Sequence, residues 1–199
     1  MNVFSLYYFG PVSYYSSLRK ADDIFFDKYE YYRKQTYRNR MEIATSHGKF
    51  TLTIPVRKES GSKTAMKDVK IAYDEAWQKQ HWRALLTAYS NAPFFLYYQD
   101  EIKKIYQKKY TFLIDLNLQS IEILQSILQQ KLDWSFTEKY IETGMDEVKN
   151  FRNYFSPKMQ KTKPMKVYSQ VFEDRHSFIP DLSILDLIFN EGNSSYLYL

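Results

Sequence analysis

The chain of 199 residues contains no cysteine, five glycines, six prolines and no long apolar run. The absence of thiols excludes a disulfide-stapled secreted domain and any zinc or iron–sulfur site built on thiolates. No stretch supplies the roughly 20 apolar residues of a membrane helix. The N-terminus has neither the basic region nor the cleavage site of a signal peptide. We therefore expect a soluble, cytoplasmic, bacterial-type protein without a transmembrane segment.

The common catalytic signatures are missing as well. The sequence has no G-x-S-x-G, no Walker A motif and no G-x-G-x-x-G, so serine hydrolases, P-loop enzymes and dinucleotide-fingerprint enzymes lose their support. Its three histidines, His47, His81 and His176, are scattered and lack metal-binding spacing. We predict no metal site, and the sequence identifies no cofactor.

What the chain has in excess is tyrosine, with 19 residues beside 14 phenylalanines and three tryptophans. Tyrosine combines an apolar ring with a hydroxyl, and it therefore suits pockets, sugar platforms and interfaces. Compositional drift is the favoured explanation for most of these residues. The net charge of +5 is spread along the chain and favours anionic partners only mildly.

The first quarter of the chain predicts a β-α-β unit. Residues 1–10 are apolar and aromatic and end at Gly10-Pro11, which indicates a buried strand followed by a loop. Residues 13–21 fit a helix, and residues 24–26 form an apolar run typical of a central parallel strand.

A β-hairpin is expected next. Residues 40–44 and 50–56 flank the polar loop 45–49, and the second arm alternates apolar and polar residues. Residues 57–67 are interpreted as a surface loop and residues 69–73 as a further strand.

Helical periodicity begins at Asp74 and stops at Asn91-Ala92-Pro93. Two further helical tracts, 99–115 and 117–131, predict a helical hairpin, and Asn117 suits the N-cap of its second helix.

The rest of the chain is predicted to return to the core. A polar segment with a basic run (Lys158, Lys161, Lys163, Lys166) precedes a predicted strand at 167–172 and a final helix at 183–189. The fold class is α/β, with a mainly parallel central sheet, a β-hairpin and an added α-helical hairpin. As one domain it divides into an α/β core with the β-hairpin (1–98), the helical hairpin (99–141), a polar loop segment (142–166) and a C-terminal strand and helix (167–199).

The densest polar cluster runs from Asp27 to Arg40. In an extended chain alternate side chains share a face. Glu30, Tyr32 and Lys34 would then point one way, and Arg38 and Arg40 would share a second face if extension resumes. Such a face suits an anion, because arginine forks bind phosphate or carboxylate and lysine adds a point charge. A solvated, charged edge strand explains the same pattern slightly better. Nucleic-acid binding ranks lower, because no recognised nucleic-acid motif is present.

His81 lies one helical turn from both Trp77 and Leu85. A histidine on an apolar stripe is more often a core residue than a catalyst. The structural interpretation of His81 is therefore favoured over the catalytic one.

Seven blocks in fixed order nevertheless resemble the WbqC-like protein family over nearly the whole chain. They are Tyr8-Phe9-Gly-Pro11-x-x-Tyr14-Tyr15, Glu30-x-Tyr32-x-Lys34-Gln35-Thr36-Tyr37-Arg38-Asn39-Arg40, Leu52-Thr53-Ile54-Pro55-Val56, Trp77-x-x-x-His81, Tyr89-x-x-Ala92-Pro93-Phe94-Phe95-x-Tyr97-Tyr98, Tyr168-x-Gln170-Val171-Phe172 and Leu182-Ser183-Ile184-x-Asp186-x-Ile188-Phe189-Asn190. The resemblance implies a link to gene clusters for O-antigen and other surface polysaccharides, and a suspected transferase role. It supplies no catalytic residue.

Our leading hypothesis is a transferase that uses an activated sugar or acyl donor and a sugar acceptor. In it Lys34, Arg38 and Arg40 hold the donor's phosphate or carboxylate, Tyr8, Tyr32 and Asn39 orient the acceptor, Gln35 joins the binding set, and Glu30 or His81 shuttles a proton. The alternative is a non-catalytic binding or scaffold protein of the same pathway. No nucleic-acid partner is expected, and the sequence is compatible with an oligomer.

Overall fold

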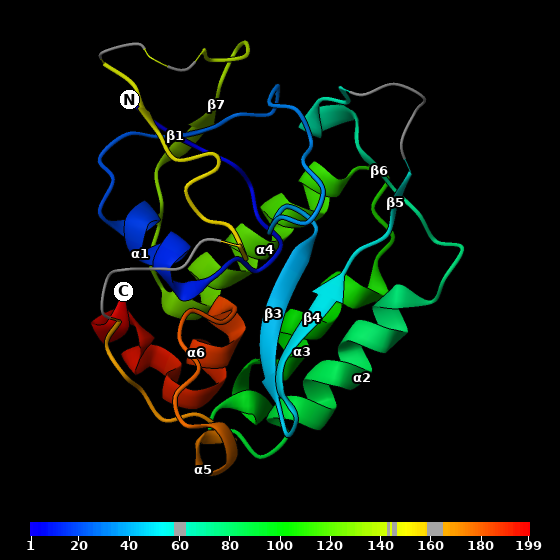
Figure 1. Ribbon diagram of the computed structural model, residues 1–199, viewed down its shortest axis with the longest axis vertical. Coiled ribbons are helices and arrows are strands. Elements are labelled where there is room, and N and C mark those ends of the chain that lie inside the picture. Colours follow the sequence, from blue (N-terminus) through cyan, green and yellow to red (C-terminus); the bar gives the residue numbers. More distant parts are fainter. Residues whose placement is uncertain (58–62, 143, 145–146, 159–164) are drawn as a thin grey trace.

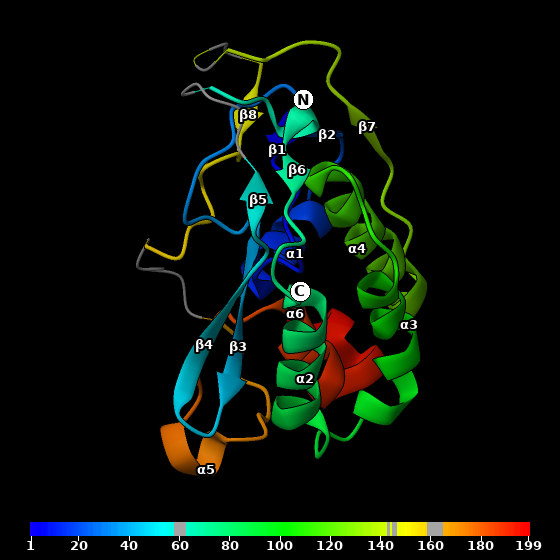
Figure 2. The ribbon, with the colours of Figure 1, turned by 90° about the vertical axis from the view of Figure 1, so that its right-hand side faces the viewer.

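The computed structural model describes residues 1–57, 63–142, 144, 147–158 and 165–199. Its described part combines a parallel sheet, a separate antiparallel hairpin and α-helices, so the predicted α/β class is confirmed (Figure 1). Figure 2 shows the antiparallel hairpin on one side of the molecule and helices from the middle of the chain on the other.

The central sheet has four strands in the order β7-β2-β1-β8, and every neighbouring pair is parallel. β1 (Asn2–Phe4) and β2 (Ile24–Phe26) are joined by α1 (Val12–Arg19), which confirms the predicted β-α-β opening. The outer strands are β7 (Trp134–Phe136) and β8 (Lys149–Asn150).

Neither outer strand was predicted from the sequence, which had assigned residues 99–141 to a helical hairpin and residues 142–166 to a polar loop. The predicted strand at 167–172 is wrong, because this segment is irregular. Buried and exposed side chains alternate in this segment because Tyr168 and Gln170 point inward and both donate to Asp186, and not because the segment pairs with a strand.

The predicted β-hairpin is present, with a tighter turn than expected. β3 (Arg40–Thr45) pairs with β4 (Gly48–Thr53), so that only Ser46 and His47 connect them. Gly48 adopts a φ of +97°, which a residue with a side chain rarely adopts. One face of the hairpin, which carries Met41, Ile43 and Leu52, is buried.

Pro55 interrupts the second arm, which the sequence had predicted to continue to residue 56. β5 (Val56–Arg57) instead pairs antiparallel with β6 (Lys70–Ile71), in a small sheet of its own. The short 3-10 helix η1 (Met66–Asp68) precedes β6, and residues 58–62 of the predicted surface loop lie outside the described residues.

The helical centre of the chain follows the predicted periodicity. α2 (Trp77–Tyr89) buries its predicted apolar stripe, and α3 (Phe95–Gln107) packs against it and against α4 (Leu113–Leu128). The predicted tract 99–115 breaks after residue 107, because residues 108–112 leave the helix to lie beside β6.

Asn117 is a further correction, since it lies inside α4 rather than at its N-cap. Its side chain is fully buried, and its amide nitrogen donates to the carbonyls of Leu6 (3.1 Å) and Arg38 (2.8 Å). The residue therefore joins α4 to two loops of the core.

The polar segment 142–166 was expected to be a loop. Residues 143, 145–146 and 159–164 lie outside the described residues, and with them Lys161 and Lys163 of the basic run. The described part contains β8 and the buried side chains of Arg152 and Phe155.

The C-terminal helix returns to the core as predicted. α6 (Ile184–Glu191) begins at Ser183, whose hydroxyl accepts from the Leu185 N–H, and it is almost wholly buried. The short α5 (Glu173–His176) precedes it, and the 3-10 helix η2 (Gly192–Tyr198) follows it.

A buried carboxylate ties this end of the chain together. Asp186, fully buried on α6, accepts from the Tyr89 hydroxyl (2.9 Å), the Tyr168 hydroxyl (2.8 Å) and the Gln170 amide (2.8 Å). Burial raises the pKa of Asp186 to about 6, although these three donors oppose the shift.

Replacing Asp186 by alanine should lower the free energy of unfolding by at least about 3 kcal/mol, because it strands three buried donors. Because the folded pKa of Asp186 lies above its unfolded value, its protonation favours folding below about pH 4, and that contribution is lost as pH rises to about 6. The difference in stability between wild type and variant, measured by urea unfolding, should therefore shrink between pH 4 and 6. A difference that grows over this range would contradict the assignment.

Candidate functional site

A polar side chain follows each strand of the parallel sheet at its carboxyl end. Ser5 follows β1, Asp27 follows β2, Thr137 follows β7 and Arg152 comes two residues after β8. All four are buried. This edge is where open α/β sheets bind ligands, so its occupancy decides where a ligand can enter.

Glu30 and Arg38 of the predicted anion site meet at this edge and pair with each other. The Arg38 Nε donates to Glu30 Oε1 at 3.0 Å and its Nη2 donates to Oε2, a two-pronged ion pair whose side chains are 1% and 4% exposed. The Ser5 hydroxyl donates to the same carboxylate at 2.9 Å. Burial raises the pKa of Glu30, and the charge of Arg38 and its hydrogen bonds oppose that shift.

A second buried ion pair closes the edge. Arg152 donates to Asp27 at 2.5 Å, and Thr137 donates to the other oxygen of Asp27 at 3.1 Å. The carbonyl oxygen of Arg152 accepts from Ser5 (2.8 Å) and Arg38 (3.0 Å). The carboxyl edge is thus filled by the protein's own groups.

Tyr8 and His81, 73 positions apart, are brought into direct contact. The Tyr8 hydroxyl lies 3.0 Å from His81 Nδ1 and 2.6 Å from the Tyr106 hydroxyl, all within the core. The His81 ring is also hydrogen-bonded to the Thr53 backbone. Burial lowers the pKa of His81 to about 4, although this last bond opposes the shift, so the imidazole is neutral at pH 7.

The remaining predicted residues lie near the edge without converging on one point. Lys34 and Gln35 occupy an exposed turn, where Gln35 has a φ of +59°. Burial raises the pKa of the Tyr32 phenol, and the nearby charge of Arg40 opposes that shift. Asn39 is buried, and its amide donates to the Ile54 carbonyl at 2.8 Å.

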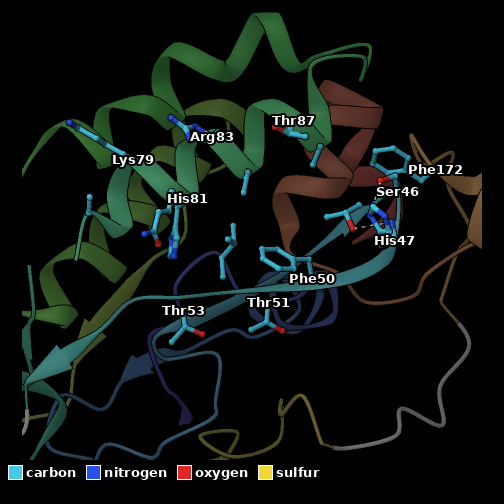
Figure 3. A pocket seen from close by; sticks show the side chains of 16 residues that line it. Ser46, His47, Phe50, Thr51, Thr53, Lys79, His81, Arg83, Thr87 and Phe172 are labelled. Atoms are coloured by element: carbon cyan, nitrogen blue, oxygen red, sulfur yellow. Dashed lines mark hydrogen bonds between the residues drawn. The ribbon is translucent and has the colours of Figure 1, made fainter. Parts of the chain in front are cut away.

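A cleft of about 1150 Å³ lies between β4 and α2 (Figure 3). His81 lies in it and points from α2 toward β4, with Phe50 on the opposite wall. Neither Glu30 nor Arg38 lines it. Its lining residues are Thr45, Ser46, His47, Phe50, Thr51, Leu52, Thr53, Ala76, Lys79, Gln80, His81, Arg83, Ala84, Thr87, Ala88 and Phe172.

The charge of this cleft has one sign. Lys79 and Arg83 line it from α2, one helical turn apart and exposed, and no aspartate or glutamate is among its lining residues. Within the described part of the chain, neither cation forms an ion pair. Sequence reasoning missed both residues, because an exposed Lys-x-x-x-Arg on a helix is the ordinary pattern of a solvated face.

Comparison with known proteins places the chain among its relatives. The model of the WbqC-like protein family matches residues 7–153. The chain belongs to the WbqC-like family. It is also 27% identical, over 84% of its length and 83% of the relative's, to Uncharacterized protein Rv1507c of Mycobacterium tuberculosis. No solved structure matches it.

The blocks that carried the resemblance now have physical roles in this WbqC-like chain. Glu30 and Arg38 close the sheet edge, Tyr168 and Gln170 hold Asp186, and Tyr8 meets the histidine of the Trp77-x-x-x-His81 block. No described helix is both long and apolar enough to cross a bilayer. The described residues also contain no group of three or more side chains suited to hold a metal ion.

Replacing Arg38 by methionine should lower the free energy of unfolding by about 3–5 kcal/mol, because it leaves the Glu30 carboxylate buried and unpaired. The double variant Glu30→Gln with Arg38→Met removes both charges and should recover much of this loss. Chemical unfolding of the three proteins tests the coupling. Equal stability of single and double variants would contradict a structural pair.

His81 should make stability depend on pH in the opposite sense to Asp186. Its pKa is lower in the folded chain than in the unfolded one, so between about pH 4 and 6.5 only the unfolded chain binds the proton. The stability lost on His81→Gln, measured by urea unfolding, should therefore increase across this window and level off above it.

Proposed function

We propose that this WbqC-like protein is a cytoplasmic transferase of surface-polysaccharide assembly, of the O-antigen type, and that it binds an anionic donor in the cleft between β4 and α2. The observation that carries the proposal is the one-signed charge of the cleft: among the described residues its two cations form no ion pair, and no carboxylate lines it. A phosphate or carboxylate can therefore bind there without repulsion.

The cleft also has the chemical composition of a small-molecule site. Its volume of about 1150 Å³ can hold a ligand of nucleotide-sugar size. Apolar groups such as Phe50, Leu52 and Ala84 alternate along its walls with hydroxyl and amide groups. Such a surface suits a ligand with both an apolar face and polar edges.

The structure changes which residues we assign to the site. Lys79 and Arg83 replace Lys34, Arg38 and Arg40 as the groups proposed to hold the donor's anion. Of the two candidate proton shuttles, His81 lines the cleft and Glu30 does not. His81 would have to exchange its bond to Tyr8 or to the Thr53 backbone before it could move a proton.

A non-catalytic binding protein of the same pathway is the second candidate. It is favoured because both predicted proton shuttles already bond other groups of the protein. Glu30 is paired with Arg38, and His81 is bonded to Tyr8 and to the Thr53 backbone. The two candidates share the binding site. Turnover of the bound donor separates them, because only the transferase consumes it in the presence of an acceptor.

Replacing both Lys79 and Arg83 by alanine should weaken binding of a nucleoside diphosphate such as UDP at least about tenfold, since it removes two charge-assisted contacts. Isothermal titration calorimetry measures this. The control, Lys20→Ala with Lys131→Ala, makes the same charge change on exposed residues outside the cleft. Equal affinity in the two variants would refute the site, as would failure of the wild type to bind a panel of nucleotides and coenzyme A.

A further inference from the structure

The outer edge of β4 is an open row of backbone donors and acceptors. On β3, the Glu42 carbonyl accepts from Ser183 and the Ala44 N–H donates to Tyr89, so these residues face away from β4. In an antiparallel pair residues alternate between facing the partner and facing outward. Given the register of the hairpin, Thr51 and Thr53 on β4 therefore direct their backbone groups outward.

These outward groups border the cleft, because Thr51 and Thr53 line it. The Thr53 backbone already bonds the His81 ring. The N–H and C=O of Thr51 and the N–H of Thr53 have no partner within the described chain. The wall of the cleft therefore presents two donors and one acceptor, close together and fixed by the strand.

Next to this edge, Phe50 presents an aromatic ring to the cleft. Phe50 shares the inner face of the hairpin with Ile43 and Leu52, which are buried, yet it is 48% exposed. Ala84 and Ala88 of α2, which have small side chains, line the same cleft. Figure 3 shows the ring beside the strand, within the cleft.

We propose, building on the proposed function, that the donor carries a sugar and that its pyranose ring lies on Phe50 with its hydroxyls bonded to the open edge of β4. A pyranose has a face of C–H groups that packs on the electron-rich face of an aromatic ring. Its hydroxyls both donate and accept, and they match the mixed groups of Thr51 and Thr53. Lys79 and Arg83 then hold the phosphate to which the sugar is attached.

Two other occupants fit this wall less well. An acyl chain lying against it would cover the Thr51 backbone groups without bonding them, which is unfavourable. An extended peptide needs a longer free edge. This one is bounded by the bond from Thr53 to His81 on one side and by the hairpin turn on the other.

The test compares nucleoside-diphosphate sugars, each with its own nucleoside diphosphate, by isothermal titration calorimetry. In the wild type at least one sugar conjugate should bind about tenfold more tightly than the matching diphosphate. Phe50→Ala should abolish this sugar-dependent gain and leave the affinity for the diphosphate unchanged. Phe50→Tyr, which keeps the ring, should preserve the gain, whereas Phe50→Leu, which keeps an apolar side chain, should not.

The edge is tested separately through Thr51. Thr51→Pro removes the outward N–H without touching the hydrogen bonds between β3 and β4, and it should reduce the sugar-dependent gain several-fold. Thr51→Val keeps the N–H and is the control. If Thr51→Pro proves unstable, the Phe50 series decides alone.

The outcomes separate this inference from the proposed function. If nucleoside diphosphates bind through Lys79 and Arg83 but no sugar adds affinity, the sugar assignment is wrong and the anionic-donor proposal stands. Tighter binding of acetyl-coenzyme A than of every sugar conjugate also overturns the sugar assignment. If none of these compounds binds, both proposals fail.

Discussion

The constraint on which the rest of the structure depends is the pairing of four charges at the carboxyl edge of the parallel sheet. Glu30 with Arg38 and Asp27 with Arg152 are buried, and an unpaired charge in that position would be strongly destabilising. The pairs therefore fix the loops that carry them. They also fill the place where sheets of this kind bind ligands, and the ligand site that we propose is therefore the cleft between β4 and α2.

The sequence predicted the elements whose pattern is long or whose boundaries are marked. The β-α-β opening, the hairpin, α2 and α6 follow from apolar periodicity and from the break at Gly10-Pro11. The outer strands β7 and β8 span three and two residues, too few for a periodic signal. At 167–172 the alternation is real but has another cause, because Tyr168 and Gln170 reach for a buried carboxylate instead of a neighbouring strand.

Site residues were harder to predict, because the chemistry of a side chain does not reveal whether it binds a ligand or another residue of the protein. In the sequence, an arginine that binds a phosphate cannot be distinguished from one that pairs with a buried carboxylate, as Arg38 does with Glu30. The contact of Tyr8 with His81 depends on how α2 packs on the core, which residue spacing does not encode. Among the residues of the WbqC-like motifs, Glu30, Arg38 and Tyr8 bond other groups of the protein itself.

The carbonyl of Arg152 has a consequence for how the chain folds. The Arg152 carbonyl accepts from Ser5, which lies 147 positions earlier, and the Arg152 side chain pairs with Asp27, which lies 125 positions earlier. The Ser183 hydroxyl donates to the Phe9 carbonyl, 174 positions away. Contacts of such long sequence separation slow folding. On the ribosome the first strand and its aromatic loop emerge early, long before Arg152 and Ser183, which bond Ser5 and the Phe9 carbonyl. These bonds can therefore form only after synthesis has reached the last quarter of the chain.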